Sequence, residues 1–265
     1  MSLRRMRRTA ALACALALCA FRYWLERLCG PLTLERRAVW LQSAARGVLA
    51  SLDVQFNVEG RPPTRGLLVS NHLSYLDILL YAAAEPCFFI AKSEVGKWPY
   101  FGWAASAGGT IFLERTSLAG ARLAANQIAG RLALPIPVLL FPEGTSTDGN
   151  VVLPFRARLF QPAVEARAPV AAAAVRYIAS GDEPERELCW FGDAPFLPHL
   201  WKLLGGAGFR AQIRYGQPQI YSDARIAACA TRDVVVRMRA KPGRSMDAAF
   251  ELSLAGLYRA SLLER

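Results

Sequence analysis

The sequence has few cysteines and no paired arrangement of them. Its six cysteines include no C-x-x-C pair, so they predict neither a zinc site nor a small disulfide framework. Three lie in the apolar N-terminal region and the others in apolar surroundings, where a free cysteine behaves as a small hydrophobic residue. We therefore expect no metal site, and a reducing compartment is the simplest interpretation.

Two further absences narrow the chemistry. No G-x-S-x-G sequence occurs, which argues against the nucleophile elbow of an α/β-hydrolase. Residues 206–211 fit G-x-G-x-x-G/A, but no strand is predicted before them and no βαβ unit after them. We interpret this segment as a turn rather than a dinucleotide-binding loop.

Lysine is scarce, and arginine carries the positive charge. The net charge is +11, and 28 of the 32 basic residues are arginine, which suits planar recognition of phosphate and carboxylate. Such a charge fits binding to nucleic acid, to an anionic membrane surface or to an acidic carrier protein. The basic residues are dispersed rather than gathered in a stripe with exposed aromatics, so we expect no nucleic-acid binding. A non-catalytic, basic membrane-binding protein stays an alternative.

Residues 1–52 are predicted to be a membrane-anchoring helical segment. Arginines occur within residues 1–8, residues 9–21 are apolar, and a break at Gly30-Pro31 precedes a second helical pattern over residues 33–52. Two such helices suit a hairpin on or partly within one leaflet. A cleaved secretory signal and an ordinary core helix are the alternatives.

Residues 53–265 have the pattern of an α/β domain. Strands alternating with helices predict a mixed, largely parallel sheet flanked by helices. The region 222–240 is ambiguous between strand and helix, and residues 246–264 predict a terminal amphipathic helix. The predicted strands are 53–58, 66–70, 87–91, 109–113, 137–141, 169–175 and 211–215, and the predicted helices are 76–84, 117–133 and 155–167.

His72 and Asp77 form the pair best suited to catalysis. The chain has only two histidines, and His72 follows an apolar run that predicts a short buried strand. The two side chains of this H-x4-D pair converge only if His72 lies in a loop and Asp77 on the first turns of a helix. A carboxylate fixes the tautomer of an imidazole and stabilises the imidazolium formed when it takes a proton. Taken alone, the pair also fits a histidine that caps a helix start.

Four sequence blocks together resemble the PlsC-type glycerolipid acyltransferases, a family of 1-acylglycerol-3-phosphate and lysophospholipid acyltransferases. The resemblance covers roughly residues 55–180. The blocks are Asn71-His72-x-Ser74-x-x-Asp77, Gly109-Thr110-Ile111-Phe112-Leu113-Glu114-Arg115, Phe141-Pro142-Glu143-Gly144-Thr145-Ser146 and Ala168-Pro169-Val170-Ala171.

This resemblance implies transfer of a fatty acyl group to a lysolipid hydroxyl, with His72 as general base and Asp77 as its partner. It implies direct attack by the acceptor on a thioester, with acyl-CoA or acyl-carrier protein as co-substrate and no further cofactor. Ser74 is then a hydrogen-bonding residue at the helix start rather than a nucleophile. The substrate-binding residues that we expect are Arg115, Glu143, Gly144, Thr145, Lys92 and Asn71.

The acceptor and the location follow from the same resemblance. Lysophosphatidic acid is the first choice, and binding of its phosphate is assigned to Arg115. The run from Glu143 to Asn150, which leads to Leu153-Pro154-Phe155, resembles a branch that includes lyso-ornithine lipid acyltransferases. The sequence departs from the family at Phe155-Arg156-Ala157-Arg158, where Phe-Lys-x-Gly is frequent: the cation is kept and the glycine is not. A hydrolase using the same His–Asp pair is a third possibility. We expect the enzyme at the cytoplasmic face of a bacterial inner membrane.

Overall fold

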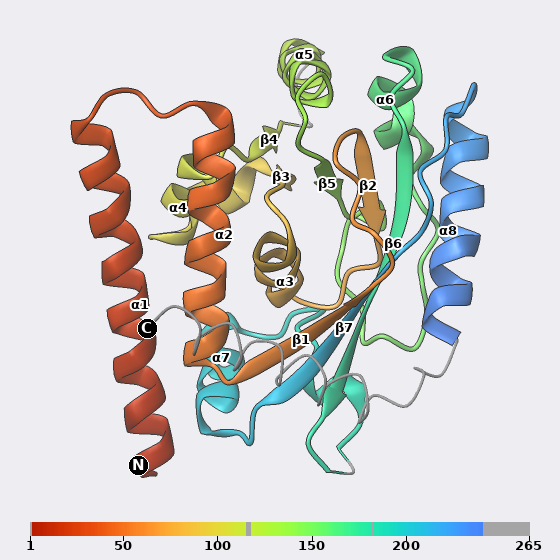
Figure 1. Cartoon of the computed structure of the whole chain (residues 1–265). Helices are drawn as coiled ribbons and strands as arrows, with labels where there is room; N and C mark the ends of the chain where they lie inside the picture. Colours follow the sequence, from red (N-terminus) through yellow and green to blue (C-terminus); the bar gives the residue numbers. More distant parts are fainter. Residues whose placement is uncertain (1, 115–117, 182, 241–265) are drawn as a thin grey trace, which may run out of the picture.

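The computed structural model describes residues 2–114, 118–181 and 183–240 (Figure 1). Its centre is a seven-stranded sheet with strand order β1-β7-β6-β2-β5-β3-β4. Neighbouring strands of this sheet pair parallel except β6 and β7, which pair antiparallel. The expected mixed, largely parallel sheet is therefore confirmed. The strands are β1 (Val54–Glu59), β2 (Leu67–Ser70), β3 (Phe88–Lys92), β4 (Ile111–Leu113), β5 (Val138–Leu140), β6 (Val170–Ala179) and β7 (Phe209–Tyr215).

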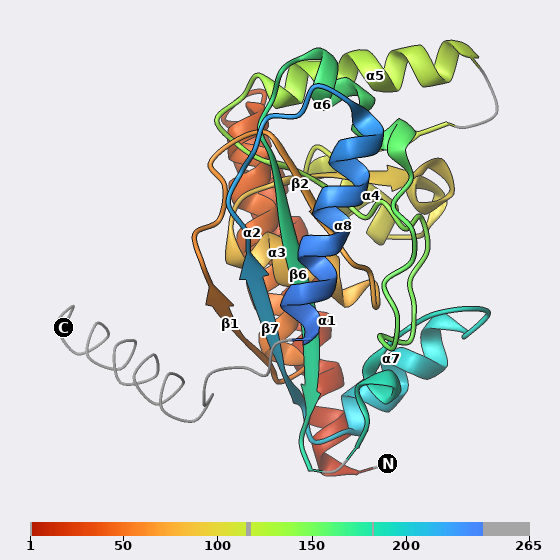
Figure 2. The same ribbon diagram turned by 90° about the vertical axis from the view of Figure 1, so that its right-hand side faces the viewer.

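Helices cover both faces of the sheet. In Figure 1, α2 and α3 lie on one side and α8 on the other, and Figure 2 shows α8 running along β6. The helices are α1 (Leu3–Leu28), α2 (Leu34–Ser51), α3 (Leu76–Ala84), α4 (Phe101–Ala107), α5 (Leu118–Leu132), α6 (Gln161–Glu165), α7 (Phe196–Gly205) and α8 (Ala224–Ala240), with short 3-10 helices η1 (Ser93–Lys97), η2 (Ala157–Phe160) and η3 (Glu185–Leu188).

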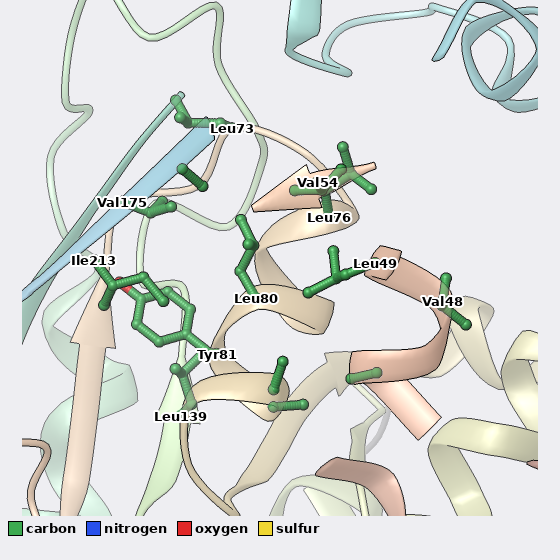
Figure 3. Packing of buried hydrophobic residues seen from close by; sticks show 14 of the residues in the cluster. Val48, Leu49, Val54, Leu73, Leu76, Leu80, Tyr81, Leu139, Val175 and Ile213 are labelled. Atoms are coloured by element: carbon green, nitrogen blue, oxygen red, sulfur yellow. The ribbon is translucent and has the colours of Figure 1, made fainter. Parts of the chain in front are cut away.

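The central strands are buried on both faces, which explains their unbroken apolar sequences. Every residue of β2 and β5 is buried, as expected where helices pack on both sides of a parallel sheet. One core cluster joins the sheet to α2 and α3, where Leu49 and Leu80 pack together with Leu139 and Val175 (Figure 3). A second cluster joins the sheet to α5 and α8.

The structure resolves one ambiguous prediction and corrects another, and local hydrogen bonding and proline explain both outcomes. Residues 224–240 form a helix, because the Asp223 carboxylate accepts the backbone N–H groups of Arg225 and Ile226 at 2.8 and 2.9 Å and so caps it. The single helix predicted for residues 155–167 is wrong. That segment is η2 followed by α6, with Pro162 in the first turn of α6, where its missing N–H costs nothing. The helix predicted for residues 246–264 lies outside the described residues.

Residues 3–51 contain two packed helices that differ in burial. Helix α1 is uninterrupted over 26 residues, about 39 Å at 1.5 Å per residue. It is therefore longer than its apolar run alone suggests. Helix α2 packs against α3 and buries Trp40, Ala45 and Leu49 in the core, and the indole N–H of Trp40 donates to the carbonyl of Cys19 on α1 at 3.1 Å. The division of the chain into segments 1–52 and 53–265 stays a prediction.

Candidate active site

The candidate site lies where parallel strands of the sheet end. His72 follows β2, Phe141 follows β5, and Lys92 is the last residue of β3. Because these strands run parallel, their carboxyl ends meet at one edge of the sheet, which is where ligands bind in α/β folds. The fold thus brings together two of the blocks recognised in the sequence.

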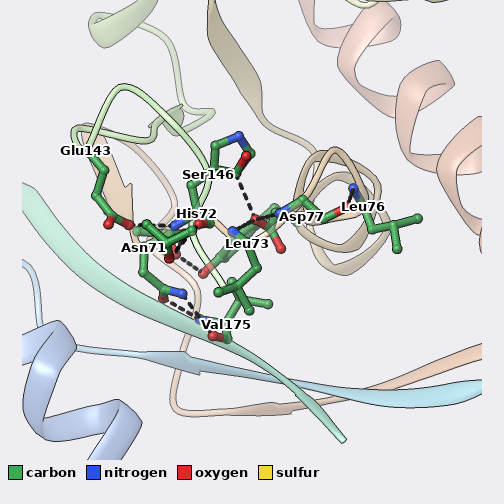
Figure 4. A network of polar contacts seen from close by, with 12 residues as sticks. Asn71, His72, Leu73, Leu76, Asp77, Glu143, Ser146 and Val175 are labelled. Atoms are coloured by element: carbon green, nitrogen blue, oxygen red, sulfur yellow. Dashed lines mark hydrogen bonds and ion pairs between the residues drawn. The ribbon is translucent and has the colours of Figure 1, made fainter. Parts of the chain in front are cut away.

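His72 and Asp77 are in hydrogen-bond contact, as the sequence predicted. His72 Nδ1 lies 2.8 Å from Asp77 Oδ2, and the Asp77 side chain is fully buried (Figure 4). The same oxygen accepts the backbone N–H groups of Leu73 and Ser74 at 2.6 and 3.1 Å, which fold the loop around the carboxylate. The arrangement favours a proton on Nδ1, so Nε2 is the nitrogen available as a base. Within the described ranges, no hydrogen bond from Nε2 to the protein is found.

Buried polar contacts fix the backbone of the His72 loop. The Glu143 carboxylate accepts the backbone N–H groups of His72 and Leu153, both at 2.8 Å, and so ties the loop after β2 to the loop after β5. Burial raises the pKa of this carboxyl, and the two backbone donors oppose that shift. The Asn71 side chain is also buried and bonds both the N–H and the carbonyl of Val175 on β6, at 2.9 and 3.1 Å. The structure thus gives Asn71 and Glu143 a role in holding the loop, and direct contact of either with substrate stays a prediction.

Ser74 lies just before the start of helix α3. Its hydroxyl is buried and lies 3.4 Å from the backbone nitrogen of Leu76, the first residue of α3. This contact agrees with the hydrogen-bonding role implied by the family resemblance. The neighbouring Asn71 does not cap α3, because its side chain bonds to β6.

A cavity of about 320 Å³ opens beside His72. Lys92, Gly144 and Thr145 line it, as do Trp98 and Trp190, and most of its wall is apolar. The Phe141 ring stacks on the His72 imidazole with 4.1 Å between ring centres. A second, larger groove of about 750 Å³ shares Ile90, Leu113 and Leu159 with it.

The backbone conformation at Gly144 favours glycine, and the Arg156 side chain lies against it. Its φ is +74°, which L side chains rarely adopt, and a Cβ there would lie 2.7 Å from the guanidinium carbon of Arg156. Arg156 therefore stands against the turn after β5, as a cation beside the cavity. Arg115, the residue assigned to head-group binding, lies outside the described residues. Asp148 accepts hydrogen bonds from Asn150 within its own loop.

Sequence reasoning missed Tyr177 and the two tryptophans of the cavity wall. The Tyr177 hydroxyl donates to Asp77 Oδ1, and burial, with Asp77 next, raises the tyrosine pKa well above its ordinary value, so this group stays a donor. The only available signal was one aromatic hydroxyl on an alanine- and valine-rich strand. Trp98 and Trp190 lie in segments without a recognised motif. In the described part of the chain, no three His, Cys, Asp or Glu side chains are placed to hold a metal ion, and a metal-independent reaction stays a prediction.

Comparisons with known proteins agree with this geometry. A model of the acyltransferase family matches residues 54–176. A lyso-ornithine lipid O-acyltransferase of Pseudomonas aeruginosa is 36% identical over 198 residues, covering 74% of this chain and 68% of the relative. A 1-acyl-sn-glycerol-3-phosphate acyltransferase of Neisseria meningitidis is 40% identical over 136 residues, covering 50% of this chain and 53% of the relative.

A solved structure shares the fold. The 1-acyl-sn-glycerophosphate (LPA) acyltransferase PlsC of Thermotoga maritima superposes with a TM-score of 0.64 over 91% of this chain and 97% of that chain, at 18% identity. The family model spans β1 to β6 with the His72 and Glu143 loops, and the Pseudomonas relative matches over more than two thirds of its length. The chain therefore belongs to the acyltransferase family and is an acyltransferase enzyme.

Proposed function

We propose that the enzyme transfers a fatty acyl group from a thioester to the free hydroxyl of a lysolipid, with His72 as general base. The observation that carries this proposal is the His72–Asp77 pair, with Nδ1 held by a buried carboxylate and the imidazole on a cavity wall. The acceptor hydroxyl gives its proton to Nε2 as its oxygen attacks the thioester carbonyl. Asp77 stabilises the imidazolium, which returns the proton to the departing thiolate.

The shape and charge of the cavity suit these substrates. Its apolar walls exclude water from the reacting carbonyl and accept acyl chains, while Lys92 and Arg156 place positive charge beside the turn at Gly144. A guanidinium and an ammonium suit an anionic head group. Acyl-CoA or an acidic acyl-carrier protein supplies the thioester, and the protein's net charge of +11 favours both donors. No cofactor takes part in this scheme.

We place lyso-ornithine lipid first as acceptor. The support is that lyso-ornithine lipid O-acyltransferases of three bacteria match this chain over 57–74% of its length, at 36–38% identity. Lysophosphatidic acid is the second candidate, favoured by the Neisseria relative and by the two cations beside the cavity. The order expected from the sequence is thus reversed in the proposal.

The test is an acceptor panel with labelled acyl-CoA and acyl-carrier protein, using the full-length protein in detergent. We expect turnover of lyso-ornithine lipid above that of lysophosphatidic acid, abolished in His72→Ala. Asp77→Asn should cost about 10²–10⁴-fold in kcat, the range for a general base and its orienting group. Near wild-type turnover by folded His72→Ala protein would refute the base, and a preference for lysophosphatidic acid would refute the acceptor order.

The proposed location follows from the substrates and from α1. Among the described helices, α1 is the one long and apolar enough to cross a membrane. Acyl-CoA and acyl-carrier protein are cytoplasmic, so we place the catalytic domain at the cytoplasmic face of a bacterial inner membrane, in contact with its anionic lipids.

A further inference from the structure

Helix α7 has an apolar face that is exposed in the described part of the chain. Leu197 is 71% exposed and Trp201 is 44% exposed, and a four-residue spacing puts them on the same side of a helix. The other side of α7 faces the protein through the buried Leu203 and the half-buried Phe196 and Leu200. Large apolar side chains grouped on one exposed helix face are a feature of contact surfaces.

Hydrogen bonds connect the C-terminal end of α7 to the first turns of α1. Arg4 and Arg8 donate to the carbonyl of Gly206, just after α7, at 3.3 and 2.8 Å. The Arg5 guanidinium lies 4.9 Å from the centre of a ring of Trp201. Figure 1 shows α7 next to the N-terminal half of α1. The two helices therefore present their outer faces as one fixed unit.

The surroundings of this face suit an anionic lipid surface. Arg4 and Arg7 on α1 are exposed, and so are the apolar side chains of Leu3 and Met6. Lys202 on α7 is also exposed and forms an ion pair with Glu187 at 2.5 Å. Basic side chains next to tryptophan and leucine are typical of helices that lie in the membrane interface. The α7 face also lies beside α1, a helix long and apolar enough to cross a bilayer.

The inner side of α7 forms part of the aromatic cluster behind the active-site cavity. The Phe196 ring centre lies 4.9 Å from that of Tyr75 and 5.9 Å from that of Trp98, and Tyr75 Oη lies 3.1 Å from His199 Nδ1. Trp98 lines the same cavity as His72. Helix α7 therefore has its exposed face on one side and, on the other, the aromatic cluster that adjoins the cavity.

We propose that α7 is a second membrane-docking element, distinct from α1. Its Leu197–Trp201 face inserts into the headgroup boundary of an anionic bilayer and holds the wall of the His72 cavity against the lipid. The entry of a lipid acceptor from that bilayer rests on the proposed function, whereas the docking itself does not.

A spin label at position 197 tests the docking directly. The full-length protein carries Leu197→Cys, with the exposed Cys14, Cys29 and Cys229 replaced by serine. On vesicles of phosphatidylethanolamine and phosphatidylglycerol, we expect the label to be accessible to oxygen and shielded from a water-soluble nickel complex, about 5–10 Å below the headgroups. A label at Ile226, exposed on α8, is the matched control and should stay in water. A label at 197 that remains in water overturns the proposal, and so does one shielded from both reagents with spin–spin broadening, which indicates a second copy of the chain.

Kinetics separate docking from catalysis. Trp201→Glu should raise the KM for a lysolipid presented in vesicles by roughly tenfold, because insertion of one large apolar side chain is lost. It should leave turnover of a short-chain lysolipid below its micelle concentration unchanged, and Ile226→Glu should alter neither. Equal KM values for wild type and Trp201→Glu on vesicles contradict the docking. If wild type fails to use the soluble lysolipid, the proposed function fails, and the spin-label result still decides the docking.

Discussion

The Asp77 carboxylate is the residue on which the geometry of the site depends. It is fully buried, and each of its oxygens has a hydrogen-bond donor: one accepts from His72 and two backbone N–H groups, and the other from Tyr177. A buried carboxylate needs such donors, since an unpaired one is costly to desolvate. Tyr177 is therefore a positioning residue that acts through Asp77.

We predict that Tyr177→Phe lowers kcat by about tenfold and lowers the free energy of unfolding by roughly 1.5–3 kcal/mol, the value of a hydrogen bond to a charged group. The KM for the acceptor should stay constant, because Tyr177 does not line the cavity. Tyr81→Phe is the matched control. It also removes a buried hydroxyl, which lies 2.6 Å from Ser70 Oγ, and should cost stability while leaving kcat unchanged. Equal kcat losses in the two variants would show that Tyr177 is merely structural.

At the scale of single residues, the sequence predicted the His72–Asp77 pair but not the hydrogen bonds that hold the pair in place. His72 and Asp77 are found from their spacing, because a loop followed by a helix start brings such residues together. Tyr177 is 100 residues away from Asp77 along the chain, and only the pairing of β6 beside β2 places it there. Glu143 was recognised as part of a motif, but its two backbone partners depend on how two loops meet, which no local pattern encodes.

Helix α7 is one of the elements that the sequence did not predict, and it carries the second histidine, His199. His199 contacts Tyr75. Burial lowers the pKa of His199 below its ordinary value of 6.5; the Leu188 backbone opposes this shift, and the charge of Lys202 adds to it. The neutral imidazole is therefore the form that the folded protein prefers. As the pH falls below 6.5, the unfolded chain takes up the proton first, so this site contributes less stability.

We predict that the free energy of unfolding falls more steeply between pH 7.5 and pH 5 in wild type than in His199→Gln. The extra slope is at most about 1.4 kcal/mol per pH unit for a single group. Urea unfolding of both proteins at a series of pH values measures the difference, and contributions from the carboxylates cancel in the comparison. Parallel curves would mean that His199 titrates alike in the folded and unfolded chains.

Elements with a strong periodic pattern were predicted well, and short irregular ones were not. All seven strands and the helix Leu76–Ala84 lie where alternation of apolar runs and turn residues indicated. Helices α4 and α7 are short, seven and ten residues, and carry much of their apolar surface in aromatic contacts between distant segments. Such contacts stabilise a helix without leaving a periodic signal over a long window.

At the scale of the whole molecule, the first two helices have different relations to the core. The sequence assigned the apolar stripes of both to a membrane, because a stripe shows that a face is buried but not what covers it. In the structure, α2 is covered by α3, whereas α1 keeps Leu18, Phe21, Trp24, Leu25 and Leu28 exposed. The strand order was likewise beyond the sequence, since parallel pairing is decided by crossovers between distant segments.

This difference predicts opposite effects for two leucine-to-alanine substitutions. Leu49 on α2 is 2% exposed, so Leu49→Ala should lower the free energy of unfolding by about 2–5 kcal/mol, as for other buried leucines. Leu25 on α1 is 51% exposed, so Leu25→Ala should change it by no more than about 0.5 kcal/mol. Binding to anionic vesicles should reverse the order, because only Leu25 is free to contact lipid. Urea unfolding in detergent and vesicle flotation measure the two quantities, and a destabilisation of Leu25→Ala equal to that of Leu49→Ala would place α1 in the core with α2.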